Sequence, residues 1–301
     1  MVKKTKHPIR ASRSDRIFAV IVFFVITLIF ISVLYPLVYV VSSSFSSGSA
    51  VSSGKVILLP KEFSLEGYKA VFRYKAVLTS YKNTIVYTVV GTLINISMAM
   101  ITAYPLSRRD LPLKNGIMFI FVFTMYFGGG MMPSYILMRN LGLLNSFGAM
   151  VVPGALSVYN MILARTFIQS SIPPELFEAA RIDGASDIGY FIRIVLPLSK
   201  AILAVLAVFS AVGHWNSYFN AMLYLNDLDK MPLQIIVREI LVANNIDPSM
   251  IVDHEAHAAR QDLYDVLKYA LIMVCTVPIL LVYPFAQRYF ASGVMIGSVK
   301  G

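Results

Sequence analysis

The chain has 301 residues, of which 57% are hydrophobic and only 14% are Asp, Glu, Lys or Arg. Soluble proteins carry about 25% charged residues, so this composition excludes an ordinary soluble domain. The formal net charge is +10, but long uncharged runs separate the basic residues, which argues against a nucleic-acid-binding surface.

Six uncharged stretches are each long enough to cross the hydrocarbon core of a bilayer, which takes about 20 helical residues. Backbone polar groups in lipid must be satisfied internally, and long apolar runs satisfy them as α-helices. The predicted fold is therefore all-α, a polytopic integral membrane protein with six transmembrane helices. The stretches are 17–41, 83–106, 115–138, 140–164, 201–226 and 269–287.

The Lys and Arg residues indicate the orientation of the chain. With six spans both termini share one side, and that side holds 15 of the 26 Lys and Arg residues. Because short cytoplasmic segments are enriched in Lys and Arg, we predict that both termini are cytoplasmic. The apolar run after residues 1–16 is longer than the roughly 7–15 residues of a cleavable signal, so we expect it to remain as a helix.

These spans divide the chain into one transmembrane domain with cytoplasmic ends. The predicted segments are the cytoplasmic N-terminal segment 1–16, the transmembrane domain 17–287 and the cytoplasmic tail 288–301, with outer loops 42–82 and 226–268 and an inner loop 170–200. We expect the first outer loop, which is basic, to fold as a turn and a short amphipathic helix. The second outer loop is acidic.

The third span contains the sequence FGGGMMP at residues 127–133. Three glycines followed by a proline weaken a helix, so we predict a kink or an unwound segment here. Small residues also permit close helix packing in membranes, and we favour that role for the glycines over direct contact with a transported substrate.

The inner loop carries signals for two short helices joined by a turn. Pro173 and Pro174 suit a helix start, where the missing N–H is no loss. Gly184 can adopt the left-handed conformation that ends a helix, and Ser186 is a natural N-cap for the next one. Glu178 and Arg181 are three residues apart and are predicted to pair. Such an element suits docking into a groove of another protein, or is simply a well-capped solvated loop.

The sequence EAARIDGASDIGYFIRIVLP, residues 178–197, resembles the EAA loop of ABC-importer permease subunits. The resemblance implies that this loop inserts into a cleft of an ATPase subunit and carries the motion of ATP binding into the membrane. One departure is Ala201, where many sugar permeases have a second proline. The coupling residues that it implies are Glu178, Ala179, Ala180, Asp183, Gly184, Ala185 and Pro197.

Three further stretches are similar to the maltose-type, six-helix class of carbohydrate permeases, so the resemblance runs along most of the chain. HWNSYFNAMLYL at 214–225 resembles their fifth helix, and PLQIIVREIL at 232–241 resembles their outer loop that contacts the sugar-binding protein. MIGSVKG at 295–301 resembles the tail that reaches between ATPase subunits. It implies ATPase contacts for Gly297, Val299 and Lys300, and places the chain in the cytoplasmic inner membrane of a bacterium, as a multi-pass protein.

The fifth span supplies aromatic and hydrogen-bonding side chains, and sugars bind to both kinds of group. The pathway candidates are His214, Trp215, Asn216, Tyr218 and Asn220. On a helix, residues 215 and 218 share a face, as do 216 and 220. Polar side chains at membrane depth are candidate functional groups, and interhelical hydrogen bonding is an equally good explanation for any one of them.

The sequence is most similar to the subgroup of these permeases that handles complex, polysaccharide-derived oligosaccharides, and its basic first outer loop would suit an acidic one. The resemblance implies an assembly with a second, homologous permease subunit, two ATPase subunits, an extracytoplasmic sugar-binding protein, an oligosaccharide substrate and membrane lipid, without nucleic acid. ATP and Mg would bind to the ATPase subunits, and this chain would hold no cofactor. The sequence offers no catalytic residues. His254 and His257 lack firm further ligands, and the single cysteine, Cys275, cannot form a thiolate site alone, so no metal site is predicted.

Two other functions fit parts of the sequence. A secondary transporter driven by an ion gradient would need buried acidic residues in its spans, and all six stretches lack Asp, Glu, Lys and Arg. A membrane receptor or scaffold could dock a cytoplasmic partner through the inner loop, although the chain contains no recognisable signalling domain.

Overall fold

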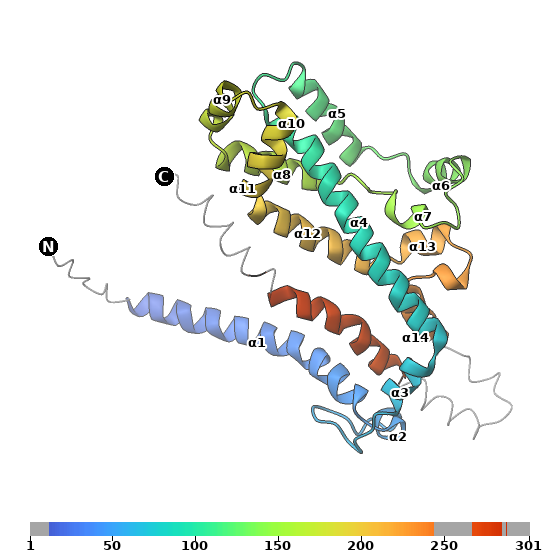
Figure 1. The fold of residues 1–301 in the computed structure, drawn as a ribbon. Helices are drawn as coiled ribbons and strands as arrows, with labels where there is room; N and C mark the ends of the chain where they lie inside the picture. Colours follow the sequence, from blue (N-terminus) through green and yellow to red (C-terminus); the bar gives the residue numbers. More distant parts are fainter. Residues whose placement is uncertain (1–11, 244–266, 285–286, 288–301) are drawn as a thin grey trace. The chain divides into compact units, whose positions relative to one another are not determined.

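Long apolar runs leave the backbone no partner but itself, and helices accordingly make up the computed structural model (Figure 1). The structure describes residues 12–243, 267–284 and 287. The helices in these ranges are α1 (Arg13–Ser44), α2 (Gly48–Ser52), α3 (Glu66–Arg73), α4 (Lys75–Ser107), α5 (Lys114–Tyr126), α6 (Met131–Asn140), α7 (Gly148–Val151), α8 (Val158–Ser171), α9 (Pro174–Ile182), α10 (Asp187–Tyr190), the π-helical turn η1 (Phe191–Val195), α11 (Leu196–Leu198), α12 (Lys200–Trp215), α13 (Phe219–Tyr224), the 3-10 turn η2 (Leu228–Lys230), α14 (Leu233–Ala243) and a last helix, Leu267–Pro284.

The chain forms two compact units. The first comprises Met1–Ala70 with Asp247–Met273, and the second comprises Val71–Ile246 with Val274–Gly301.

In the first unit, the outer loop folds against the end of α1. The Ser42 hydroxyl donates to the Leu58 carbonyl over 2.6 Å, and Ser44 shares a 2.9 Å hydrogen bond with Tyr68. Phe45 stacks on Phe63 with ring centroids 6.0 Å apart. The predicted turn and short helix are confirmed, since α3 follows this turn.

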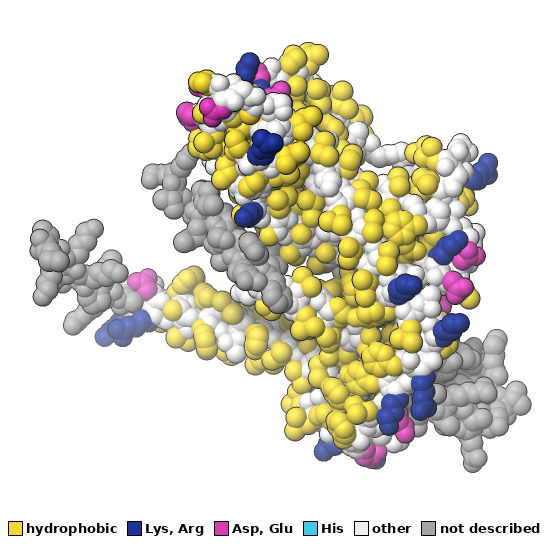
Figure 2. All heavy atoms as spheres, viewed as in Figure 1, with side chains coloured by type: hydrophobic (Ala, Val, Ile, Leu, Met, Phe, Trp, Pro, Cys, Tyr) yellow, Lys and Arg dark blue, Asp and Glu magenta, His cyan; other side chains and the backbone are white. Residues whose placement is uncertain are grey.

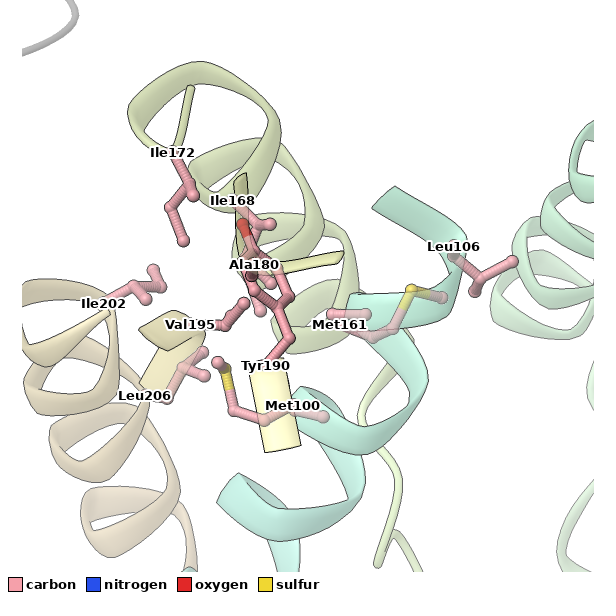
Figure 3. Close-up of a cluster of buried hydrophobic side chains, with 13 residues drawn as sticks. Met100, Leu106, Met161, Ile168, Ile172, Ala180, Tyr190, Val195, Ile202 and Leu206 are labelled. Atoms are coloured by element: carbon pink, nitrogen blue, oxygen red, sulfur yellow. The ribbon is translucent and has the colours of Figure 1, made fainter. Parts of the chain in front are cut away.

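The core of the second unit lies where α4 packs against α8 and α12. Figure 3 shows buried side chains from these three helices meeting around Ala180 of α9 and Tyr190 of α10. Met100, Met161 and Leu206, one from each long helix, are almost completely buried. The inner-loop helices are therefore part of the core and not an appendage.

Charged side chains of this unit gather around α9 and, away from it, near η2 and α14, while hydrophobic side chains cover much of α4 between them (Figure 2). This distribution suits a unit whose middle lies in lipid and whose two ends meet water.

The predicted spans are only partly continuous helices. Over the described ranges, three helices are long and apolar enough to cross a membrane, namely Arg13–Ser44, Lys75–Ser107 and Leu267–Pro284. Two bent pairs raise that number to five if each pair is one span. The first, second and sixth predicted stretches correspond to the three long helices, and the third corresponds to the bent pair of α5 and α6. The fifth stretch, 201–226, is not one helix, because α12 ends at Trp215 and α13 begins at Phe219. The other bent pair joins Asp187–Leu198, which lies in the predicted inner loop, to α12.

The fourth stretch, 140–164, was predicted as one helix, and that prediction is wrong. Asn145 and Gly154 have positive φ angles of 53° and 76°, which an α-helix does not accept, and Pro153 lies between them. The helix there, α8, starts only at Val158 and has 14 residues, a length of about 21 Å. Hydropathy alone did not register these breaks because the side chains around them are apolar.

The predicted break in the third span is confirmed, and the packing role of its glycines is not. Helix α5 ends at Tyr126, and α6 starts at Met131 with its axis turned by 110°. No described atom lies within 4 Å of where a Cβ would stand on Gly128 or Gly130. Gly130 instead has φ 84° and ψ 179°, a conformation that is essentially restricted to glycine.

We therefore expect Gly130→Ala to lower the melting temperature of the purified protein in detergent. Forcing an alanine into that conformation costs on the order of 1–3 kcal/mol. Gly116→Ala, in α5, is the matched control because its Cβ would also meet open space, and a helix favours alanine by about 1 kcal/mol. Equal melting temperatures for the two variants would contradict the strain at Gly130.

Candidate functional sites: an inner helical turn and a polar cavity

The inner loop forms the predicted pair of helices with the predicted caps. Pro174 occupies the first turn of α9, and Gly184 follows its end with φ 75°. The N–H of Ala185 donates to the Ala180 carbonyl over 2.9 Å, and that of Gly184 to the Arg181 carbonyl over 3.1 Å. This is a Schellman motif. The Ser186 hydroxyl accepts the Gly189 N–H at 3.1 Å and so caps α10.

The predicted coupling residues divide into an inward and an outward group. Ala180 is buried in the core, whereas the others are exposed, namely Glu178, Ala179, Asp183, Gly184, Ala185 and Pro197. Two apolar side chains next to the turn are also exposed, Ile182 by 86% and Ile188 by 72%. An apolar tip ringed by charge, on a turn whose backbone is fully capped, suits contact with another protein.

The predicted pair between Glu178 and Arg181 does not form among the described side chains. The Arg181 guanidinium lies 5.8 Å from the centroid of the Phe177 ring. The ion pair at this element is made by Arg108, whose Nη1 lies 2.7 Å from Asp187 Oδ1. Sequence reasoning missed Arg108 because its partners on α9 and α10 are about seventy to eighty residues away in the chain.

A second site is an open cavity of about 780 Å³ between α4, α8, α12 and the last helix. His214 and Asn220 line it, as predicted for pathway residues. Its remaining polar lining comes from residues that the sequence did not single out: Asn95, Ser157, Tyr159, Asn160, Ser210, Ser217 and Tyr283. Among the residues that the structure describes, this lining contains no Asp, Glu, Lys or Arg side chain.

Three pathway candidates lie outside the cavity lining. Helix α12 ends at Trp215, and α13 begins only at Phe219, so the predicted shared faces of 215 with 218 and of 216 with 220 are wrong. Trp215 is buried and its Nε1 donates to the Cys275 carbonyl over 3.0 Å. Asn216 donates to the Val212 carbonyl of its own helix, and Tyr218 is exposed.

Comparison with known proteins shows what these sites belong to. A solved structure described as a bacterial ABC transporter involved in the import of the acidic polysaccharide alginate superposes with a TM-score of 0.85. It is 35% identical and covers 94% of this chain and 100% of its own. Residues 9–296 match the family of binding-protein-dependent transport system inner membrane components. The chain belongs to this permease family.

Two curated relatives from Bacillus subtilis (strain 168) cover most of the permease. The polygalacturonan/rhamnogalacturonan transport system permease protein YtcP is 39% identical over 288 residues, which is 95% of this permease and 99% of the relative. Protein LplC is 40% identical over 266 residues, or 88% and 89%. The resemblance to ABC-importer permeases is confirmed. Permeases of this family are membrane subunits and not enzymes, since separate subunits hydrolyse ATP.

Buried amide side chains hold the wall of the cavity in place. The Asn95 Nδ2 of α4 donates to the carbonyls of Gly154 and Ala155 over 2.9 and 2.8 Å. The Asn160 Nδ2 of α8 donates to Ser210 of α12 over 3.3 Å. Each of the two amides joins two separate segments of the chain, so packing between helices fixes the position of Asn95 and of Asn160. A buried asparagine in an apolar span is the one signal that could have marked them.

His214 can lie at the cavity because α4 has a glycine, Gly91, where the two meet. A Cβ on Gly91 would lie 2.4 Å from His214 Cε1 and Nε2, far inside van der Waals contact. The imidazole therefore occupies the space that Gly91 leaves. Gly91 belongs to α4 and His214 to α12, so the contact between these two residues also sets the distance between the two helices.

Several predicted residues lie outside the described ranges. They are the tail residues Gly297, Val299 and Lys300 and the loop residues His254 and His257. Over the described part of the chain, no group of three His, Cys, Asp or Glu side chains could hold a metal ion.

We expect Gly91→Ala to destabilise the permease by displacing His214. Overpacking of this kind costs about 1–3 kcal/mol, which a lower melting temperature of the purified protein would report. Gly213→Ala is the control, because its Cβ would meet no described atom within 4 Å. In a His214→Ala background the cost of Gly91→Ala should disappear; an unchanged cost there would show that another contact is responsible.

Proposed function

We propose that this permease is one of two transmembrane subunits of an ABC importer for an acidic, polysaccharide-derived oligosaccharide. The observation that carries the proposal is the likeness, over nearly the whole chain, to the alginate importer. The relative named for polygalacturonan and rhamnogalacturonan supports the same class, since both names describe uronate-containing polymers. The importer would also contain a second permease, two ATPase subunits and an extracytoplasmic binding protein.

The chemistry of the cavity suits such a substrate. Its hydroxyl groups and amide oxygens can form hydrogen bonds with sugar hydroxyls, and Tyr159, Phe209 and Tyr283 offer aromatic faces. The described part of its lining contains no carboxylate that would repel a uronate. A neutral lining also avoids tight electrostatic binding by Lys or Arg side chains, so an anionic substrate could enter the cavity and leave it again. The lining thus favours passage over tight binding.

The first outer loop adds electrostatic attraction. Its basic side chains are exposed, and they are Lys55, Lys61, Lys69, Arg73 and Lys75. Clustered positive charge raises the local concentration of anions and the rate of their encounter. This positive potential would also attract an acidic surface on a binding protein. It would therefore help the substrate to arrive either free or bound to that protein.

The inner helical turn would be the coupling element. We propose that Glu178, Ala179, Asp183, Gly184 and Ala185 meet the ATPase, with Ala180 anchoring the turn in the core and Pro197 closing it. The tail residues Gly297, Val299 and Lys300 would make a further ATPase contact. Closure of the ATPases on ATP would then move α9 and α10 and expose the cavity outward, as alternating access requires.

The proposal also includes six membrane crossings, the fourth of them broken at Asn145 and Gly154, two cytoplasmic termini and location in a bacterial inner membrane. The family description as an inner membrane component supports the location. The excess of Lys and Arg in the segments assigned to the cytoplasm supports the orientation.

The substrate class is tested with the importer reconstituted in proteoliposomes with its binding protein. We expect trigalacturonate to be taken up only with ATP, whereas maltotriose, a neutral trisaccharide of equal length, is not. Uptake that needs an ion gradient and no ATP would identify a secondary transporter. Efficient uptake of maltotriose alone would refute the acidic class.

The coupling role is tested at Gly184, whose φ of 75° asparagine tolerates and a β-branched residue does not. We expect Gly184→Asn to retain ATP-driven uptake and Gly184→Val to lose most of it, because the turn can no longer present the same surface. Co-purification with the second permease checks folding. If Gly184→Val assembles and transports like wild type, the turn is not the coupling element.

A further inference from the structure

We infer that Arg108 is a positioning residue that fastens the coupling element to the inner end of α4. Through this contact, movement of α9 and α10 is passed to the helix that carries Asn95 into the cavity. The inference rests on the proposed coupling function of the inner helical turn.

The guanidinium of Arg108 is oriented by its own loop. Its Nε donates to Asp110 Oδ1 over 2.8 Å, and its Nη2 donates to Asp110 Oδ2. This two-point pairing fixes the plane of the guanidinium. It also lowers the pKa of Asp110 to about 2, chiefly through the hydrogen bond from Arg108, so the carboxylate stays charged at neutral pH.

The Nη1 group and the face of the guanidinium, which do not contact Asp110, lie against three helices. Nη1 donates to Asp187 Oδ1 of α10 over 2.7 Å and to the Tyr104 hydroxyl of α4 over 3.2 Å. The guanidinium carbon lies 3.8 Å from the ring centroid of Phe177 in α9. One side chain therefore contacts the coupling element twice and α4 once.

Packing holds the Arg108 side of this contact. The Arg108 side chain is only 17% exposed, whereas the Asp187 side chain is 70% exposed. Phe177, which lies against the guanidinium, meets Tyr190 edge-on with ring centroids 5.1 Å apart. Tyr104, which accepts a hydrogen bond from Arg108, packs on Phe191 at 5.1 Å. The arginine is therefore fixed by packed aromatic partners and strengthened by the cation–π contact with Phe177, while the carboxylate of Asp187 stays accessible to water.

Helix α4 is built to carry a displacement from this point. Its last carbonyls are held from α8, by Arg165 Nε to Leu106 over 2.9 Å and by Gln169 Nε2 to Ser107 over 3.2 Å. Asn95 lies 13 residues before Arg108, about 20 Å along the helix. Because α4 is continuous from Lys75 to Ser107, a shift at its inner end is felt at the cavity wall.

Replacing Arg108 with lysine tests whether the geometry of the guanidinium matters beyond its positive charge. Lysine keeps the cation but cannot make the two-point pair with Asp110 and reach Asp187 and Phe177 at once. We expect Arg108→Lys to assemble normally and to lower the number of trigalacturonate molecules imported per ATP hydrolysed by about tenfold, within the range of ordinary coupling energies. ATP hydrolysis without substrate should continue.

Asp187→Asn tests whether the effect passes through the contact. If it does, Asp187→Asn alone lowers the same ratio, and the double variant with Arg108→Lys is no worse than Arg108→Lys alone. Arg109→Ala is the matched control, since Arg109 is the neighbouring exposed arginine and should leave the ratio unchanged. Melting temperature and co-purification of every variant exclude simple unfolding.

The outcomes separate this inference from the proposed function. If wild type transports with ATP and Gly184→Val does not, but Arg108→Lys keeps the wild-type ratio, Arg108 does not position the element. Additive losses in the double variant would likewise overturn the contact. If wild type itself needs no ATP, or Gly184→Val transports normally, the proposed coupling function fails regardless of Arg108.

Discussion

The second unit depends on one constraint, the close approach of α4 to α8 and α12 inside a membrane. Lipid offers helices no hydrophobic gain from meeting each other, so small side chains that let backbones approach supply the stability. Five of the ten buried residues of α4 are small and lie at spacings of four, seven or eight, namely Ser80, Thr84, Gly91, Ala99 and Ala103. The cavity, the position of His214 and the place of the inner helical turn all follow from this stripe.

The two ends of the same helix are fastened by different chemistry. At the outer end, Asn83 and Tyr87 donate to backbone carbonyls of Asp229 and Lys230 over 2.7 and 2.8 Å, and Thr84 accepts the Leu233 N–H at 2.8 Å. These neutral bonds hold η2 and the start of α14. At the inner end, a charged group and aromatic rings hold α9 and α10. One helix therefore joins η2 and the start of α14 to the inner helical turn, the proposed coupling element.

The sequence predicted the helix ends and caps of the inner helical turn because their determinants are local, although the predicted pair of Glu178 with Arg181 does not form among the described side chains. Pro174, Gly184 and Ser186 act on backbone within a few positions, and each does what its chemistry dictates. The breaks in the fourth span were not predicted, since hydropathy averages over residues such as Asn145 and Gly154, and only His214 and Asn220 of the cavity lining were predicted. The place of Trp215 depends on the Cys275 carbonyl, and that of Arg108 on Asp187, partners that only the tertiary fold brings near. Short-range signals therefore sufficed to predict the inner helical turn, whereas contacts between distant parts of the chain determine the cavity.

The exposed turn at Gly184 has a consequence for how such importers diversify. No described atom lies within 4 Å of the place that a Cβ on Gly184 would take, and the backbone hydrogen bonds of Gly184 and Ala185 close the turn within its own segment. Mutations that reshape the cavity, such as changes at Asn95 or Ser210, leave those bonds intact. If the cavity selects the substrate and the turn meets the ATPase, as proposed, the two properties rest on different residues of one chain, and a change of substrate need not change the ATPase contact.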